Sequence, residues 1–202
     1  MSDVWGRDRG TPIDRYYIES FLRRHSGDIR GDVLELLDSG YTDRFGTGVT
    51  TCDILDIDPQ NPRATLVADL AAADDIAEAS YDCFILTQTL QFIYDVRAAV
   101  SHAYRILRPG GVVLCTVPSV SRVARRTLDS EHWRFTQASC QRLFGDVFRP
   151  DAVAVRSYGN VLACVAFLAG LAAEELTPDE LEFEDVYFPL VVSVRATRSA
   201  SS

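Results

Sequence analysis

The sequence predicts an α/β fold, in which a mostly parallel sheet is covered by helices on both faces. Its strand-like segments, such as 83–86 and 112–118, are continuous apolar runs rather than alternating ones. Such runs are typical of strands that are buried on both sides. They alternate with segments of helical periodicity, which is the pattern of βα units with right-handed crossovers. A chain of 202 residues is long enough for one domain with a sizeable core.

The first third of the chain contains one predicted helix and three predicted strands. Behind Thr11-Pro12, apolar residues at roughly helical spacing predict a helix over 12–24. The runs 31–38, 49–58 and 64–70 are predicted strands, and prolines after 58 stop the second. The stretch of Gly, Thr and Asp that ends near Gly48 is assigned neither helix nor strand.

The remainder continues the alternation. A strand is predicted at the start of 81–93, a helix over 95–107 with one apolar face, and a strand over 112–118. The sequence RPGG separates the last two as a helix breaker and a tight turn. Further predicted elements are a helix opening at Thr136, a strand at 152–159, a helix over 160–176 with Asn160 as its N-cap, and a strand at 187–198.

Composition disfavours several classes of function. The formal charge of −9 and the pI near 4.8 disfavour binding to nucleic acid or to anionic membranes. The polar N-terminus has no signal-peptide core, and the longest apolar run, 161–173, is too short to span a bilayer. Five scattered cysteines fit neither a disulfide framework nor a zinc site. We therefore expect a cytoplasmic protein without a metal centre.

Ligands of open parallel sheets bind where the strands end. The predicted strand ends carry acids and amides, and few Lys or Arg residues. A phosphate-bearing cofactor prefers glycine amides and cations, so this set better suits a ligand with hydroxyls, amines and a positive centre. An acid after the second strand can accept both hydrogen bonds of a ribose diol. Asp53 and Asp56 both fit that role, depending on where the strand ends.

Five segments carry a resemblance to a known family. VLELLDSG, DILDID, VADL, YDCFILTQTLQFI and RILRPGGVVLCTVP occur in an order and spacing that resemble class I S-adenosylmethionine-dependent methyltransferases. The last two segments, with WRFT and LFGDVF after them, are similar to the small-molecule (type 11-like) branch. The N-terminal RGTPIDRYYIESFL resembles the first helix of a bacterial subgroup found beside glycosyltransferases or in secondary metabolism.

The resemblance implies a single Rossmann-like domain with a seven-stranded, mostly parallel sheet. We expect this domain to span 31–198, after an N-terminal helical cap segment at 1–30 and before a disordered tail at 199–202. It also implies residues for the cofactor. Those expected to hold the methionine end are Glu35, Leu37, Asp38, Ser39, Gly40 and Tyr41.

The resemblance assigns the rest of the cofactor to later strand ends. Asp53 or Asp56 would accept from the ribose diol, and Asp69 with Leu70 would face the adenine.

Near the sulfonium, the resemblance places Thr87 and Gln88, with Gln91 directed toward the acceptor.

One departure from the family pattern lies in the loop after the first predicted strand. The family follows its acid with Gly-x-Gly-x-Gly, and in this chain Leu37 and Ser39 stand at the first two glycines.

The acceptor side is less clearly marked. A hydroxyl acceptor benefits from a general base, and His132 in SEHWRFT is the candidate. Trp133, Arg134 and Tyr16 are candidate substrate contacts, although Trp133 could equally pack against the last helix. Tyr17 is expected in the core.

We therefore expect S-adenosylmethionine-dependent methyl transfer to a small molecule, with a sugar or natural-product hydroxyl as acceptor and S-adenosylhomocysteine as product. The alternative is a protein that keeps the fold without methyl transfer, as a binding or scaffold partner or as the catalyst of a step such as cyclisation. A nicotinamide-dependent reductase is disfavoured, because no Gly-rich fingerprint follows any strand. Expected partners are a second copy or a glycosyltransferase.

Overall fold

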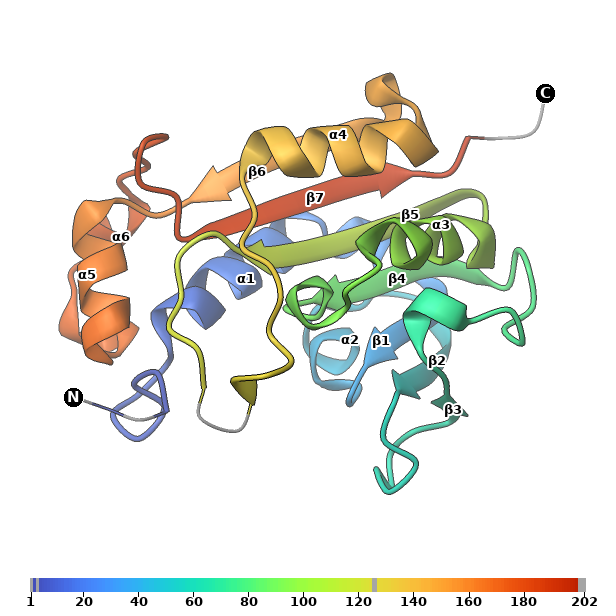
Figure 1. Cartoon of the computed structure of the whole chain (residues 1–202), viewed down its shortest axis with the longest axis horizontal. Coiled ribbons are helices and arrows are strands. Elements are labelled where there is room, and N and C mark those ends of the chain that lie inside the picture. Colours follow the sequence, from blue (N-terminus) through green and yellow to red (C-terminus); the bar gives the residue numbers. More distant parts are fainter. Residues whose placement is uncertain (1, 3, 125–126, 200–202) are drawn as a thin grey trace.

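The computed structural model describes residue 2 and residues 4–124 and 127–199. A seven-stranded sheet in the order β3-β2-β1-β4-β5-β7-β6 forms the centre of the molecule (Figure 1). All of the pairs among β1 to β5 are parallel, and β7 runs antiparallel to β5 and β6. The predicted fold class is therefore confirmed. The strands are β1 (Gly31–Leu36), β2 (Val49–Asp56), β3 (Leu66–Val67), β4 (Tyr81–Thr87), β5 (Leu107–Pro118), β6 (Val153–Tyr158) and β7 (Val191–Thr197).

Two apolar cores lie on the two faces of this sheet. The helices are α1 (Ile13–Arg24), α2 (Gly40–Phe45), α3 (Val96–Ile106), α4 (Gln137–Phe148), α5 (Val161–Ala169) and α6 (Pro178–Glu182). Buried residues of α3 and α4 pack on one face, and those of α1, α2, α5 and α6 pack on the other. Figure 1 shows α3 and α4 on the side opposite α1.

Polar side chains fix where the predicted helices begin. Asp95 caps α3 by accepting from the N–H of Ala98, and Asn160 caps α5 through the N–H of Ala163. Thr136 caps α4. These three helix starts agree with the sequence predictions.

Several predicted boundaries are wrong. The stretch between β1 and β2, assigned no element, contains α2. The predicted helix over 160–176 ends at Ala169, because Gly170 adopts a left-handed φ of 75° that stops it. The predicted strand over 64–70 shrinks to the two residues of β3, and the RPGG turn lies within β5, where the pairing with β4 shifts its register.

The N-terminal segment is attached to a distant part of the chain. The N–H of Thr11 donates to Glu174 (2.9 Å), and the N–H of Ala173 donates to the Thr11 carbonyl (2.8 Å). An isolated β-bridge joins Pro12 to Ala172. These contacts hold the segment before α1 near the carboxyl ends of the strands. Residues 200–202 of the predicted tail lie outside the described residues.

Candidate functional site

A cavity of about 310 Å³ opens at the carboxyl ends of β1 and β4. Its size is at the lower end of the range for small-molecule sites. The loop after β1, the end of β4, the first turns of α1 and the N-terminal segment all contribute to its wall. The lining residues are Val4, Trp5, Arg7, Pro12, Asp14, Arg15, Ile18, Glu35, Leu36, Leu37, Asp38, Tyr41, Thr87 and Gln88.

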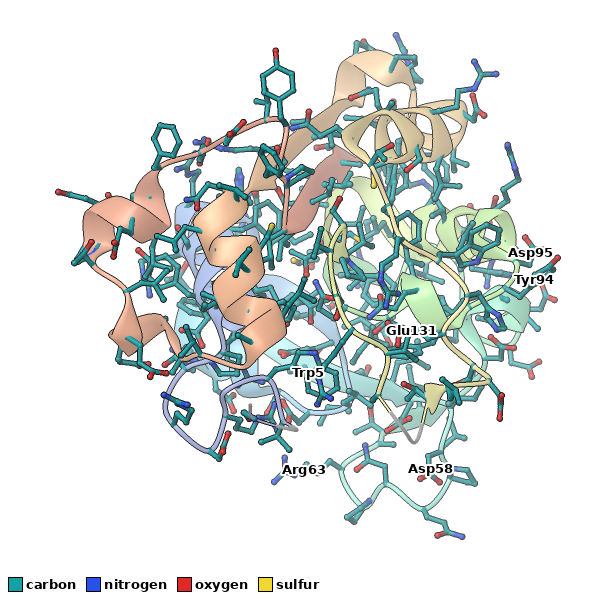
Figure 2. The ribbon with its side chains drawn as sticks, turned by 60° about the vertical axis from the view of Figure 1, so that its left-hand side comes forward. Trp5, Asp58, Arg63, Tyr94, Asp95 and Glu131 are labelled. Atoms are coloured by element: carbon teal, nitrogen blue, oxygen red, sulfur yellow. The ribbon has the colours of Figure 1, made fainter. Side chains whose placement is uncertain are left out.

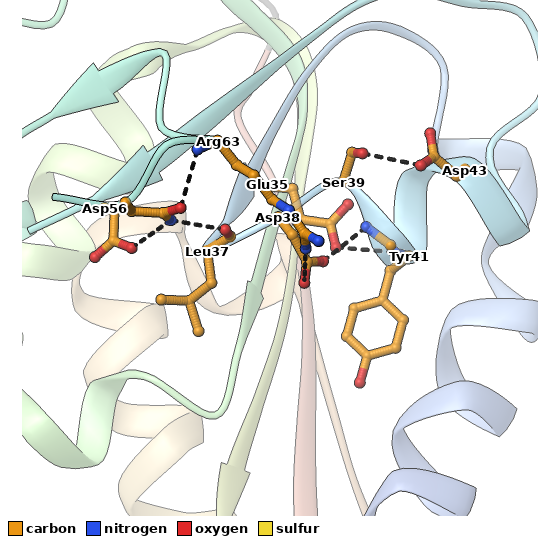
Figure 3. A network of polar contacts seen from close by, with 10 residues as sticks. Glu35, Leu37, Asp38, Ser39, Tyr41, Asp43, Asp56 and Arg63 are labelled. Carbon is orange, nitrogen blue, oxygen red and sulfur yellow. Dashed lines mark hydrogen bonds and ion pairs between the residues drawn. The ribbon is translucent and has the colours of Figure 1, made fainter. Parts of the chain in front are cut away.

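Glu35 shapes the loop after β1. Its side chain is only 2% exposed, and its two carboxylate oxygens accept from the backbone N–H groups of Tyr41 (2.9 Å) and Thr42 (2.8 Å) (Figure 3). These N–H groups belong to the first turn of α2, which has no partner for them within the helix. Burial raises the pKa of Glu35, and the two backbone donors partly oppose this rise. Glu35 therefore holds the loop in place with both of its oxygens.

Leu37 adopts a backbone conformation that favours glycine. Its φ is +69°, a left-handed value at which a residue with a Cβ is strained. In the resemblance described above, glycine stands at this position, and here a leucine adopts the left-handed conformation. The leucine side chain is 61% exposed and lines the cavity.

The other predicted loop residues interact with one another and with Arg63 and Asp43. Asp38 accepts from the N–H of Gly40 (2.8 Å) and pairs with Arg63 (3.4 Å), and the Ser39 hydroxyl donates to Asp43 (2.9 Å) (Figure 3). Asp38 lines the cavity, whereas Ser39 and Gly40 do not.

The structure distinguishes the two candidate ribose acids. Asp56 ends β2 beside the loop, where Asn61 Nδ2 donates to both its Oδ2 (2.7 Å) and the Leu37 carbonyl (2.9 Å). Asp53 lies within the strand, and its carboxylate accepts from the hydroxyls of Thr65 and Tyr81. Of the two, only Asp56 is connected to the strand-end loop. Neither lines the cavity.

The predicted adenine residues lie outside the cavity as well. Asp69 caps a short 3₁₀ turn by accepting from the N–H of Ala71 (2.9 Å). The Leu70 side chain is buried in the core beneath α3, so only its backbone is available to a ligand.

The turn after β4 carries a polar atom without a partner. Thr87 and Gln88 both line the cavity, and Gln88 has a left-handed φ of +47° while its N–H donates to the Thr116 carbonyl (2.8 Å). The side-chain Nε2 of Gln88 is buried and has no hydrogen-bond partner among the described residues. A buried amide nitrogen without an acceptor is costly.

The predicted acceptor residues lie beside this turn rather than in the cavity. Gln91 is buried, with its Nε2 donating to the Gln88 carbonyl, and its own carbonyl accepts from the N–H groups of His132 (2.7 Å) and Trp133 (3.3 Å). The His132 ring is exposed and meets the edge of Tyr94. Arg134 pairs with Glu131 (2.8 Å). The structure thus brings His132 onto the surface, away from the cavity wall.

Figure 2 shows where these segments lie on the molecule. Tyr94 lies on the surface, and Glu131 lies on the segment that follows β5. Trp5, from the N-terminal segment, is stacked under the Arg122 guanidinium at 4.6 Å from its ring centroid. The N-terminal segment and the segment after β5 therefore meet near the cavity.

The face of α1 that reaches the cavity carries Arg15 but not Tyr16, the two residues that were expected to cover the cofactor together. Tyr16 lines shallow hollows next to α6 and is absent from the cavity wall. Asp14, Arg15 and Ile18 line the cavity instead, because they share a helix face that points away from Tyr16. Tyr17 is buried and donates to the Leu181 carbonyl, as expected of a core residue. The helical periodicity of residues 12–24, which places Asp14 on the same face as Ile18, was the signal that could have identified Asp14.

The geometry can now be compared with known proteins. Residues 43–115 match the family model described as Methyltransferase domain. The match begins after the altered loop of Leu37 and Ser39 and extends into β5. A search of curated proteins gave no match.

Solved structures with the same fold include methyltransferases. A SAM-dependent methyltransferase from Archaeoglobus fulgidus aligns at 11% identity and a TM-score of 0.59, covering 91% of this chain and 94% of its own. A chain from a complex between the Haloferax volcanii Trm112 methyltransferase activator and a candidate methyltransferase aligns at 18% identity and a TM-score of 0.61. The alignment covers 98% of this chain and 95% of that one. The [4+2]-cyclase SpnF aligns at 12% identity and a TM-score of 0.58, and the alignment covers 96% of this chain and 85% of SpnF. At these identities the likeness establishes a methyltransferase-type Rossmann-like fold.

Two further properties bear on the site. Within residues 4–124 and 127–199, His, Cys, Asp and Glu side chains form no group of three that could hold a metal ion. No helix in that part of the chain has the length and apolar character needed to cross a bilayer.

Proposed function

We propose that the protein binds S-adenosylmethionine at the carboxyl ends of β1, β2 and β4 and transfers its methyl group to a small molecule. The observation that carries this proposal is the strand-end cavity, whose wall includes Thr87 and Gln88 after β4 and Glu35 and Asp38 at the end of β1. The carboxylates of Glu35 and Asp38 in the same wall favour a ligand with a positive centre. The family-model match supports the same activity.

The residues have distinct roles in this proposal. Thr87 and Gln88 border the sulfonium region, and Asp56 accepts from the ribose. When bound, the cofactor supplies a methyl group that its sulfonium already activates. The protein then contributes mainly orientation and exclusion of water. Asp69 and the Leu70 backbone are assigned to the adenine.

We place the acceptor, a hydroxyl of a sugar or natural product, at Gln91, Trp133 and Arg134. His132 remains the candidate base, although its ring is exposed and a base must come within hydrogen-bond reach of the proton it removes. Loss of transfer in His132→Ala with unchanged cofactor affinity would support this role.

The alternative function is a cyclisation or a binding role without methyl transfer. Two observations favour it: the Leu37 side chain stands where the family has glycine, and a cyclase shares the fold. Cofactor binding without transfer to any of a panel of hydroxylated acceptors would favour this alternative.

Titration calorimetry with S-adenosylmethionine and S-adenosylhomocysteine tests the proposal. We expect binding in the micromolar range. Gln88→Leu should weaken it roughly 10-fold, because the variant replaces a polar side chain of the cavity wall with an apolar one. Gln60→Leu is the matched control, since Gln60 is exposed and absent from the cavity wall. Absence of heat with folded wild-type protein would reject cofactor binding.

The finer sequence predictions remain proposals: a cytoplasmic location, a role in secondary metabolism, and a homodimer or an association with a glycosyltransferase. Light scattering of the purified protein tests the dimer.

A further inference from the structure

The loop after β1 has few backbone donors left for a ligand. In related nucleotide sites, this loop offers backbone N–H groups to the ligand. In this chain those groups donate within the protein. Leu37 donates to the Leu55 carbonyl, Asp38 to the Leu36 carbonyl, Gly40 to Asp38, and Tyr41 and Thr42 to Glu35. The charged end of a ligand therefore needs partners from another element.

The first turn of α1 supplies a carboxylate and a guanidinium side by side. Asp14 and Arg15 both line the cavity, opposite the loop that carries Tyr41. The Arg15 guanidinium lies 5.9 Å from the centroid of the Tyr41 ring, at cation–π distance. Arg7, from the N-terminal segment, lines the same cavity.

Within the described part of the chain, the side chains of Asp14, Arg15 and Arg7 form no salt bridge with one another or with other residues. Of the three carboxylates in the cavity wall, Glu35 uses both oxygens for backbone donors, and Asp38 uses its two oxygens for Gly40 and Arg63. Asp14 accepts from the N–H of Arg15 with Oδ1 (2.8 Å), and its Oδ2 has no hydrogen bond or ion pair. Neither Arg7 nor Arg15 forms an ion pair with a described carboxylate.

A carboxylate beside a guanidinium, neither of them held in a salt bridge, is complementary to a zwitterion. We infer that the first turn of α1 binds the α-amino acid end of the ligand, with Arg15 facing its carboxylate and Asp14 facing its ammonium. This inference rests on the proposed function, because S-adenosylmethionine and S-adenosylhomocysteine both carry that group. Burial also raises the pKa of Asp14, and the Arg15 N–H together with the positive charges of Arg15 and Arg7 partly opposes this rise. The amino acid end is thus recognised from α1, in place of the altered loop.

Two ligands and a matched pair of arginines test the inference by calorimetry. S-adenosylhomocysteine carries the amino acid end, and 5′-methylthioadenosine is a thioether nucleoside that lacks it. Arg15→Gln and Asp14→Asn should each weaken S-adenosylhomocysteine binding roughly 10- to 100-fold, because charge-assisted hydrogen bonds are the stronger kind. Both variants should leave the affinity for 5′-methylthioadenosine within about 2-fold of the wild-type value. Arg15→Lys, which keeps the charge, should lose less S-adenosylhomocysteine affinity than Arg15→Gln.

Arg23→Gln is the control. Arg23 also lies on α1 above an α2 ring, 5.7 Å from the Phe45 centroid, but it does not line the cavity. The Arg23→Gln variant should bind both ligands with the affinity of the wild-type protein.

The inference is overturned if Arg15→Gln and Asp14→Asn leave S-adenosylhomocysteine affinity unchanged, or if they weaken both ligands equally. Equal affinity of wild-type protein for the two ligands would also overturn it, and that measurement requires no variant. If folded wild-type protein binds 5′-methylthioadenosine and S-adenosylhomocysteine, the proposed cofactor site stands whatever the variants do. If it binds neither, the proposed function and this inference fail together.

Discussion

Replacement of Glu35 should destabilise the protein in two distinct steps. In Glu35→Gln, the amide oxygen can still accept from one of the two backbone N–H groups of Tyr41 and Thr42, while the amide NH₂ faces the other. In Glu35→Ala, both donors lose their acceptor inside a site where the native side chain is only 2% exposed. The two variants therefore remove one and two hydrogen bonds from the same loop.

The size of each step follows from these contacts. A hydrogen bond to a charged group contributes about 1.5–3 kcal/mol, and a buried donor left unsatisfied costs a similar amount. Desolvation of the Glu35 carboxylate, which raises its pKa, offsets part of this, and a neutral glutamine avoids that cost. We expect a loss of about 2 kcal/mol for Glu35→Gln and about 4 kcal/mol for Glu35→Ala.

Urea unfolding measures both losses. With an m-value of about 2 kcal/mol/M, Glu35→Gln should lower the unfolding midpoint by about 1 M. Asp38→Asn is the control, because Asp38 accepts from a loop N–H as well but is about half exposed. It should cost less than about 1 kcal/mol. Equal destabilisation by Asp38→Asn and Glu35→Gln would refute the role assigned to Glu35.

Three further predictions concern single residues. Leu37→Gly should be more stable than Leu37→Ala by about 1 kcal/mol, since both lose the side chain and only glycine relieves the left-handed φ; thermal unfolding decides the order. Asp56→Ala should weaken S-adenosylhomocysteine binding in calorimetry more than Asp53→Ala, and equal effects would contradict the ribose assignment. The raised pKa of Glu35 means that the folded state binds its proton more readily than the unfolded state. The stability advantage of wild type over Glu35→Gln should therefore shrink as pH rises from the ordinary value of 4.5 through the raised pKa, and a constant difference across that window would refute it.

The sequence was sufficient to predict the sheet and most helix starts because these depend on local, repeated signals. Continuous apolar runs marked β4 and β5, and Asn160 and Thr136 marked the first residues of α5 and α4. α2 left no such signal. It is six residues long, and its first turn is capped by Glu35, a strand residue that precedes it.

The site was predicted in part for the same reason. Glu35 is the last residue but one of β1, and Leu37 and Gln88 directly follow β1 and β4, so strand ends were enough to place them at the cavity. Tyr16 and His132 depended on how a helix and a long segment turn in three dimensions, and neither lines the cavity. A segment that is held by its backbone, as His132 is by the Gln91 carbonyl, gives no sequence signal for the direction of its side chain.

The attachment of the N-terminal segment to residues 172–174 has a consequence for the order of folding. Thr11 and Glu174 are 163 positions apart, and contacts of such separation form late because closing a long loop costs entropy. During synthesis, the segment that carries Trp5 and Arg7 is made before residues 172–174 and gains these partners only after they have been made. The complete cavity therefore forms only once residues 172–174 are in place. A ligand that requires this segment would select and stabilise the fully folded molecule over every partly folded one.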